Sequence, residues 1–367
     1  LQMQAADRSG SLKELQVYVN DVPLGRLDLS TTKGLKIDVG SIRIPLAVGE
    51  NRIQASAFNE AGLESLRQTI QITRTVTAAN APDLYLLAVG VSDYANNDLD
   101  LSVAAKDALD LSSAFQGIGG DSAFGEIKVR TVLDQEATRE AILAAGEFLK
   151  ESTPDDCVIV FVAGHGFQDE AYEYWFGTHD IDYEKPAERG LSYDSLEGLF
   201  DGIAARKRLL LMDTCFAGEV DKEELRLAAE KTLESTGLAV RASKLAARGV
   251  GKVETEGSLA FQNELFAQFR KRTGATVLTA SSGVEFVFAE ENGELGNGVF
   301  THALMKGLQS NAADLDNDRH LRLSEWMNFA FSEVVSYTSG RQRPTGRQIN
   351  RELNFVCLLY TSDAADE

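Results

Sequence analysis

Two continuous apolar runs constrain the fold of this chain most strongly. The first runs from Val158 to Ala163 and ends at Gly164-His165-Gly166, and the second runs from Leu209 to Met212 and ends at Asp213-Thr214-Cys215. Uninterrupted apolar runs of this length are typical of parallel strands that are buried on both faces. In open α/β sheets, functional residues gather at the carboxyl ends of the strands. We therefore expect His165 and Cys215 to reach the same edge of one sheet.

A histidine and a cysteine at one edge form a recognisable chemical pair. A thiol attacks a carbonyl group as a thiolate, and a neighbouring histidine can remove its proton. Gly166 allows close approach of a substrate, and the backbone N–H groups of Gly166 and Cys215 are candidate oxyanion donors. A single histidine or a single cysteine after a strand is usually structural, but the pair is harder to explain in that way. The sequence therefore predicts a cysteine peptidase with His165 as base and Cys215 as nucleophile.

The pattern around these runs predicts a doubly wound α/β fold. From Leu84 onward, apolar strands alternate with segments of helical periodicity, as in a mostly parallel sheet with helices on both faces. The expected strands cover 84–91, 126–133, 158–163, 172–176, 209–212 and 276–279, and the expected helices cover 101–115, 139–149, 193–204, 221–247, 260–271, 298–308 and 324–335.

Residues 1–75 have a different pattern. Short alternating segments at 15–19, 35–39, 52–58 and 68–72 are separated by turn residues, which predicts a small antiparallel β-sandwich. This segment resembles the Ig-like modules often fused to bacterial enzymes, and we interpret it as a spacer or as a module that binds a protein partner. Residues 76–83 form the predicted linker, and 84–356 the predicted catalytic domain.

Both ends of the chain carry expectations of their own. The sequence begins with Leu1 instead of Met, so we expect an N-terminally truncated chain. The last residues, 357–367, resemble translated adapter sequence, and we exclude them from the fold prediction as a non-native tail.

Composition excludes several function classes. A net charge of −20 disfavours nucleic-acid binding; it is compatible with basic peptide substrates, or simply with an acidic surface that maintains solubility. No apolar stretch approaches the roughly 20 residues of a membrane-spanning helix. Three cysteines without a Cys-x-x-Cys pair indicate neither a disulfide framework nor a zinc site. A reducing compartment, and hence the cytoplasm, fits best.

The two cysteine and histidine motifs resemble those of a known family. Phe161-Val162-Ala163-Gly164-His165-Gly166 together with Asp213-Thr214-Cys215-Phe216-Ala217-Gly218 is similar to the caspase-like peptidases (peptidase C14), and most similar to the bacterial metacaspase relatives. The resemblance covers about residues 84 to 355. It implies a caspase-like fold and an endopeptidase that works through an acyl-thioester on Cys215, with His165 as the base and no cofactor required for the chemistry.

The resemblance also implies a specificity. Asp213 lies two residues before the nucleophile, and Asp107 lies in a segment that resembles the second acidic position of metacaspases. Two carboxylates in one pocket attract an Arg or Lys side chain and repel an acid, so we expect cleavage after Arg or Lys. Ala163 replaces a serine that many metacaspases have. Three alternatives stay open: a peptidase of Asp specificity, a catalytically silent scaffold, and a surface position for Asp107.

A calcium site is a further expectation. Asp314, Asp316, Asp318 and Glu325 occupy positions 1, 3, 5 and 12 of an EF-hand-like loop. Arg319 stands where glycine normally allows the sharp turn, so a degenerate loop that caps the following helix is the alternative. Some metacaspases bind activating calcium near the active site, and Asp180 and Asp182 lie in the corresponding loop.

The segment after Cys215 has a family association of its own. In the family it often contains an activating self-cleavage site. Candidate positions here are Arg241, Lys244, Arg248 and Lys252, and an exposed amphipathic helix with solvated charges is the alternative.

Overall fold

The structure is a computed structural model. It describes residues 2–6, 12–29, 36–41, 43–76, 80–118, 123–169, 173–214, 238–240, 273–281, 288–290, 295–346 and 354–359. Cys215 and the helix expected at 260–271 lie outside the described residues, as does most of the helix expected at 221–247. Within residues 221–247 the structure describes only Leu238–Val240, which form a β-strand and not a helix.

A six-stranded sheet forms the centre of the larger part of the molecule. Its order is β18-β15-β13-β9-β7-β8, and every neighbouring pair is parallel except β15 and β18. The strands are β7 (Leu84–Gly90), β8 (Ile127–Leu133), β9 (Cys157–Gly164), β13 (Lys207–Thr214), β15 (Thr276–Thr279) and β18 (Thr345–Gly346). The two apolar runs of the sequence are the adjacent strands β9 and β13, and both are almost entirely buried.

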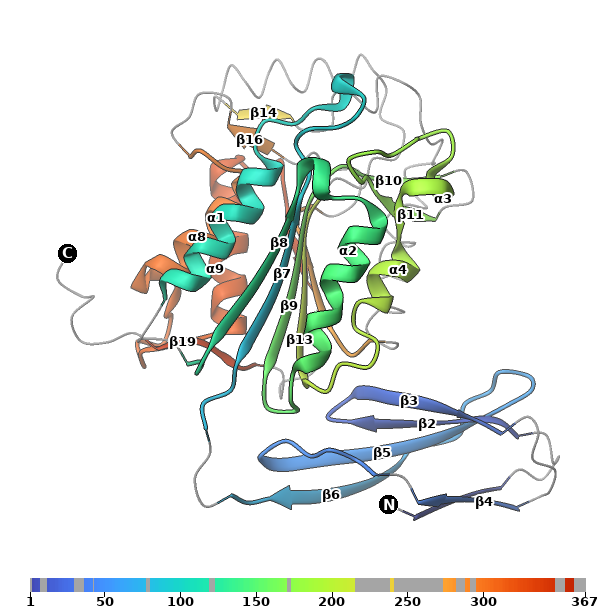
Figure 1. Cartoon of the computed structure of the whole chain (residues 1–367). Coiled ribbons are helices and arrows are strands. Elements are labelled where there is room, and N and C mark those ends of the chain that lie inside the picture. The colour runs from blue at the N-terminus through green and yellow to red at the C-terminus, as the bar shows by residue number, and fades with distance from the viewer. Residues whose placement is uncertain are drawn as a thin grey trace.

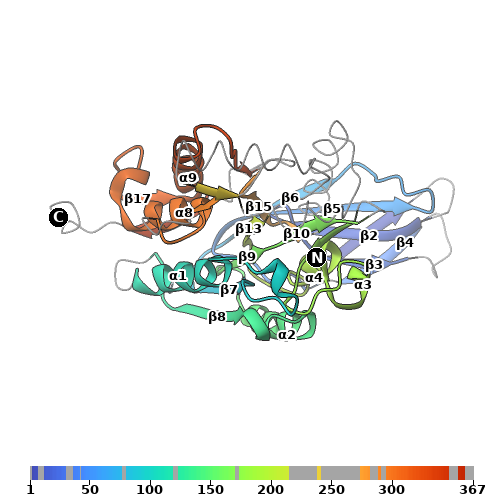
Figure 2. The same ribbon diagram turned by 90° about the horizontal axis from the view of Figure 1, so that it is seen from above.

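Helices cover both faces of this sheet, as Figures 1 and 2 show. One face carries α1 (Ala104–Gly117), α8 (Val299–Gln309) and α9 (Leu323–Tyr337), and the other carries α2 (Arg139–Gly146) and α4 (Tyr193–Gly198). Side chains that alternate along β9 enter two separate cores, so that Ile159 and Phe161 pack toward the first set while Val158 and Val160 pack toward the second. The doubly wound, mostly parallel fold is therefore confirmed.

Short elements complete this part of the chain. They are the sheet of β10 (Gly166–Gln168), β11 (Tyr174–Phe176) and β12 (Leu191–Ser192), the pairs β14 (Leu238–Val240) with β16 (Phe288–Glu290) and β17 (His320–Arg322) with β19 (Val356–Leu359), helix α3 (Pro186–Arg189), and the 3₁₀ turns η1 (Asn97–Leu99), η3 (Asp134–Glu136), η4 (Glu147–Glu151) and η5 (Asn311–Ala313).

Strand β19 corrects one expectation. It includes residues 357–359, which we excluded from the fold as a non-native tail, and it pairs with β17. The side chain of Cys357 is buried in the main core. Short apolar residues next to a polar, acidic tail gave no sequence signal for this pairing.

The N-terminal part of the chain is a small antiparallel β-structure. A four-stranded sheet has the order β3-β2-β5-β6, and a separate two-stranded sheet joins β1 to β4. The strands are β1 (Gln2–Ala6), β2 (Leu12–Val19), β3 (Val22–Asp28), β4 (Lys36–Ser41), β5 (Gly49–Asn59) and β6 (Gln68–Arg74). Alternate residues of β2, among them Leu15, Val17 and Val19, form its core with Ile53 of β5.

This β-structure contacts the amino-terminal end of the large sheet (Figure 1). The backbone N–H of Val48 donates to Oδ1 of Asp155 at 2.6 Å, Arg74 donates to Oδ2 of the same residue at 3.3 Å, and Arg206 donates to the carbonyl oxygen of Pro45 at 3.0 Å. Asp155 precedes β9, and Arg206 precedes β13. Because His165 follows the other end of β9, this contact lies at the end of the sheet opposite to the predicted catalytic edge.

A buried arginine fixes the start of β13, and its loss is expected to destabilise the protein. The guanidinium of Arg208 donates to the carbonyl oxygens of Ala205, Thr273 and Ile203, and more weakly to that of Phe200. Burial lowers the pKa of Arg208 to about 9, with the nearby Arg206 charge as a second cause. Arg208→Met should lower the free energy of unfolding by about 3 kcal/mol, because several buried carbonyl groups lose their donor. Thermal or urea unfolding measures this, with Arg130→Met on the exposed side of β8 as control; an equal effect of the two substitutions would contradict it.

No helix in the described part of the chain combines the length and the apolar character that a membrane span requires.

Candidate active site

His165 follows β9 directly and is fixed by contacts on every side. It is 1% exposed, its ring Nε2 lies 2.8 Å from the carbonyl oxygen of Leu99, and its backbone N–H donates to Oη of Tyr94 at 2.9 Å. A carbonyl oxygen can only accept, so Nε2 carries a proton. In the neutral imidazole, Nδ1 is then the nitrogen that can accept a proton.

Gly164, the residue before His165, is required by the packing. Gly164 has φ +154°, and a Cβ at this position would lie 3.0 Å from Oη of Tyr94 and 3.1 Å from the ring of Phe176. The N–H of Gly177 donates to the carbonyl oxygen of His165 at 2.8 Å. Glycine therefore allows the hydroxyl of Tyr94 to reach the backbone of His165. Gly166, a predicted oxyanion donor, is the first residue of β10.

Sequence reasoning missed Tyr94 and Leu99 as parts of this site. Both lie in the connection between β7 and α1, at the same sheet edge as His165, so a polar aromatic residue there was a usable signal. The role of Leu99 depends on its carbonyl group, for which side-chain identity gives no signal.

Replacing Tyr94 with Phe should reduce catalysis by mispositioning His165. The backbone N–H of His165 would lose its acceptor, which we expect to lower kcat about tenfold with little change in KM. Steady-state kinetics across pH measures this, and the pH profile should keep its shape because the base itself remains. Tyr85→Phe removes a hydroxyl group near the other end of β7 and is the matched control. A Tyr94→Phe enzyme with unchanged kcat would contradict the positioning role.

The end of β13 lies beside the His165 strand. Thr214 is in register with Gly164, and Asp213 is in register with Ala163. Oγ1 of Thr214 is 2.9 Å from Oη of Tyr174 in β11, a contact that joins the two sheets at this edge. Cys215, the next residue in the chain, lies outside the described residues.

Asp107 and Asp213 are both fully buried and both contact the start of α8. Oδ2 of Asp213 accepts a hydrogen bond from Oγ1 of Thr301 at 2.6 Å. Oδ1 of Asp107 accepts from the backbone N–H of Gly298 at 2.8 Å and from Nδ2 of Asn297 at 3.1 Å. Asp107 is therefore not a surface carboxylate, which excludes that alternative.

The start of α8 explains how two acids can be buried close to it. Gly298 is the N-cap of α8, and the N-terminal end of a helix stabilises negative charge. The sequence analysis assigned no role to Asn297, Gly298 or Thr301, although their place at a predicted helix start was a usable signal.

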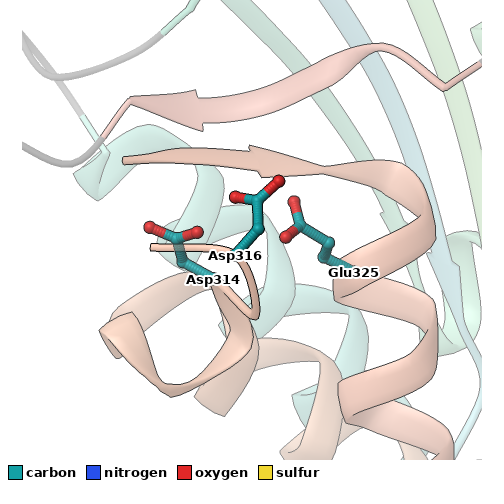
Figure 3. Close-up of side chains that lie close together, drawn as sticks. All are labelled: Asp314, Asp316 and Glu325. Atoms are coloured by element: carbon teal, nitrogen blue, oxygen red, sulfur yellow. The ribbon is translucent and has the colours of Figure 1, made fainter. Parts of the chain in front are cut away.

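Among the predicted calcium ligands, the structure brings three together. Asp314, Asp316 and Glu325 have carboxylate oxygens within 4.8 Å of one another (Figure 3). Asp318 is not part of this group, and its Oδ2 lies 2.6 Å from Nη2 of Arg322. The four-residue ligand set expected from the spacing is thus reduced to three.

The two acids of the alternative calcium loop already have protein partners. Asp180 forms an ion pair with Arg189 at 2.7 Å, and Asp182 accepts the backbone N–H of Glu184 at 3.0 Å. The self-cleavage candidates Arg241, Lys244, Arg248 and Lys252 lie outside the described residues.

Comparison with known proteins identifies a family. The caspase-domain model of peptidase C14 matches residues 85–354, which is most of the chain. Among solved structures, caspase-1 from Spodoptera frugiperda is 12% identical, with a TM-score of 0.41, over 76% of this chain and 96% of that chain. A structure of pro-sf-caspase-1 is 14% identical, with a TM-score of 0.37, over 76% of this chain and 95% of that one. No curated protein matches the sequence. Because both TM-scores are low, the assignment depends on the family model.

Proposed function

The chain belongs to the caspase-domain family of cysteine peptidases, and on this basis we propose that it is an endopeptidase that cleaves polypeptides after Arg or Lys. His165 is the general base of the proposed dyad, and Cys215 is the nucleophile. The family membership supports a polypeptide substrate; the dyad and the basic specificity are the parts that experiments must test.

The observation that carries the proposal is the hydrogen bond of the buried His165 ring to the Leu99 carbonyl oxygen. It holds the proton on Nε2, so that Nδ1 is the ring nitrogen that can accept a proton. Thr214 is in register with Gly164, so the next residues along the two strands are Cys215 and His165. Consecutive Cα atoms are about 3.8 Å apart and neighbouring strands are about 4.8 Å apart. Chain connectivity therefore keeps Cys215 within a few residues' reach of His165, which supports the proposed pairing.

The proposed reaction uses the imidazole twice. Nδ1 of His165 accepts the thiol proton of Cys215, and the thiolate attacks the carbonyl carbon of the scissile peptide bond. The oxyanion that forms accepts hydrogen bonds from the backbone N–H groups of Gly166 and Cys215. The imidazolium then gives its proton to the leaving amine as the C–N bond breaks, which leaves an acyl-thioester. Water, deprotonated by the same nitrogen, hydrolyses the thioester and restores the thiol.

The carbonyl group of Leu99 assists the charged intermediate. When both ring nitrogens carry protons, the Nε2–H donor becomes charge-assisted and its bond to the carbonyl oxygen strengthens. The contact thus fixes the orientation of the ring and favours the imidazolium in the same step.

Two buried acids support the specificity. Asp107 accepts hydrogen bonds from Gly298 and Asn297, and Asp213 accepts one from Thr301. A substrate guanidinium or ammonium near such carboxylates gains charge-assisted hydrogen bonds, whereas a substrate carboxylate is repelled.

Selective labelling of Cys215 tests the proposed nucleophile. Burial raises the pKa of Cys157 to about 12 and that of Cys357 well above its usual value, so neither is a thiolate near neutral pH. A chloromethyl ketone peptide ending in Arg should therefore add once, at Cys215, as read by intact mass and peptide mapping. The same peptide ending in Asp should react far more slowly. Absence of an adduct on Cys215, with Cys215 accessible to iodoacetamide, would favour the silent scaffold.

A further inference from the structure

The loop between η5 and β17 has a feature that the proposed catalysis does not use. Carboxylate oxygens of Asp314, Asp316 and Glu325 lie within 4.8 Å of one another, the first two from the loop and the third from the first turn of α9 (Figure 3). Three carboxylates at this separation repel one another unless a positive group lies between them.

One carboxylate oxygen of Asp314 is buried without a hydrogen-bond partner among the described residues. Asp314 is 8% exposed; its Oδ2 accepts the N–H of Arg319 at 2.8 Å, while its Oδ1 is inaccessible and has no hydrogen-bond partner among the described residues. Leaving a buried charged acceptor without a hydrogen-bond partner is energetically costly. An oxygen in this setting, next to two further carboxylates, points to a bound cation.

The backbone dihedral angles show that this loop makes its sharp turn although Arg319 replaces the usual glycine. Arg319 replaces the usual glycine, yet it has φ +67°, and Asn317 has φ +58°. The chain therefore makes the sharp turn without glycine. The side chain of Leu321, at the eighth loop position, is fully buried, and its strand β17 pairs with β19. Tertiary packing of this strand explains how the strained turn is maintained.

Arg322 and the helix cap occupy part of the space around these carboxylates. Arg322 lies 2.6 Å from Asp318, 3.6 Å from Asp316 and 3.8 Å from Glu325. Oε1 and Oε2 of Glu325 also accept the N–H groups of Leu315 and Arg322 at 3.1 and 2.9 Å. The loop thus caps α9, as the alternative interpretation expected, but each carboxylate oxygen has a second lone pair that can bind a metal.

We propose that this loop binds a calcium ion through Oδ1 of Asp314 and the carboxylates of Asp316 and Glu325. Hard divalent cations prefer oxygen ligands, and calcium tolerates an irregular set completed by water better than magnesium does. The ion would join the loop to the first turn of α9 and stabilise the α8–α9 layer. The neighbouring Arg319 and Arg322 weaken the site, so we expect a Kd of about 10⁻⁴–10⁻³ M.

The position of the loop makes this a structural site and not an activating one. The N-cap of α8 contacts Asp107, and α8 then extends 11 residues, or about 16 Å, before the loop begins. In Figure 1, α8 and α9 pack beside α1, and β19, which pairs with β17, lies at the end of this layer away from β10. Calcium should therefore change stability without being needed for peptide cleavage.

Calcium binding to the full-length Cys215→Ala protein tests the proposal, since this variant cannot cleave itself. After treatment with a chelator, isothermal titration should show binding, and 10 mM calcium chloride should raise Tm by about 3 °C or more. Magnesium at the same concentration should give a smaller shift.

Matched variants separate this site from general charge effects. Asp314→Asn should abolish the calcium response while keeping or raising Tm in chelator, because it removes an unpaired buried charge. Asp316→Asn, at an exposed position, should weaken the calcium response, and it serves as the test if Asp314→Asn does not fold. Glu140→Gln on α2 removes the same charge at another exposed site and should leave the response unchanged. No heat and no Tm shift in the parent, or an equal shift in Asp316→Asn, would overturn the proposal.

Discussion

Replacing His165 with Gln is expected to lower kcat/KM for Arg and Lys peptides by about 10³-fold. Glutamine can still donate from Nε2 to the carbonyl oxygen of Leu99, 2.8 Å from the ring nitrogen in the native protein. It cannot accept the thiol proton, so Cys215 stays protonated near neutral pH. Steady-state hydrolysis of fluorogenic peptides, with Tm measured in parallel, separates this loss from unfolding.

The pH dependence gives this prediction a second readout. A thiol without its base reacts only as it ionises by itself, near its ordinary pKa of about 8.5. Residual activity of His165→Gln should therefore rise steeply above pH 8, whereas the native enzyme should not require alkaline pH. His179→Gln is the matched control, because His179 contacts a backbone carbonyl, that of Asp93, outside the proposed dyad. A His165→Gln enzyme with native kcat/KM would exclude His165 as the base.

Asp213→Asn is expected to reduce kcat/KM for Arg and Lys peptides about 100-fold, mainly through a higher KM. The substitution keeps the size of the side chain and an oxygen that can accept from Thr301, but it removes the buried charge. A desolvated charge pair contributes about 2–5 kcal/mol when one partner is removed, which makes this loss larger than that of any surface acid.

Position-specific controls show whether the charge acts in a pocket or across the whole protein. Glu126→Gln removes one charge from the residue before β8, where the exposed side chain lies 3.5 Å from Lys128. We expect less than about a threefold change for this variant, since exposed charges are screened. Equal effects of the two substitutions, or native activity of Asp213→Asn, would contradict an acidic pocket built from Asp213.

The sequence predicted those parts of the fold where side-chain pattern and burial agree. Strands β9 and β13 are buried on both faces, and their apolar runs indicated this directly. The predicted strand at 276–279 is β15, and the predicted helices at 298–308 and 324–335 coincide closely with α8 and α9. In each, local propensity and tertiary burial favour the same structure, so a single sequence was sufficient.

The contacts that organise the site were less accessible to sequence reasoning. The partner of His165 is a main-chain carbonyl group, and any residue could supply it. The backbone N–H of Gly298 at the start of α8 donates to Asp107 of α1, although the two residues are almost 200 positions apart in the sequence. Only the folded chain brings them together. In the EF-hand-like loop, spacing identified the acids. In the folded chain Asp318 pairs with Arg322, and Asp314 has a buried oxygen without a hydrogen-bond partner among the described residues.

The most direct test of the central claim is hydrolysis of matched fluorogenic peptides that end in Arg, Lys or Asp, by the native protein and by Cys215→Ala. We expect turnover after Arg and Lys, far slower turnover after Asp, and no turnover by Cys215→Ala with any peptide. Turnover that persists in Cys215→Ala, or that occurs only after Asp, would contradict a dyad with an acidic pocket.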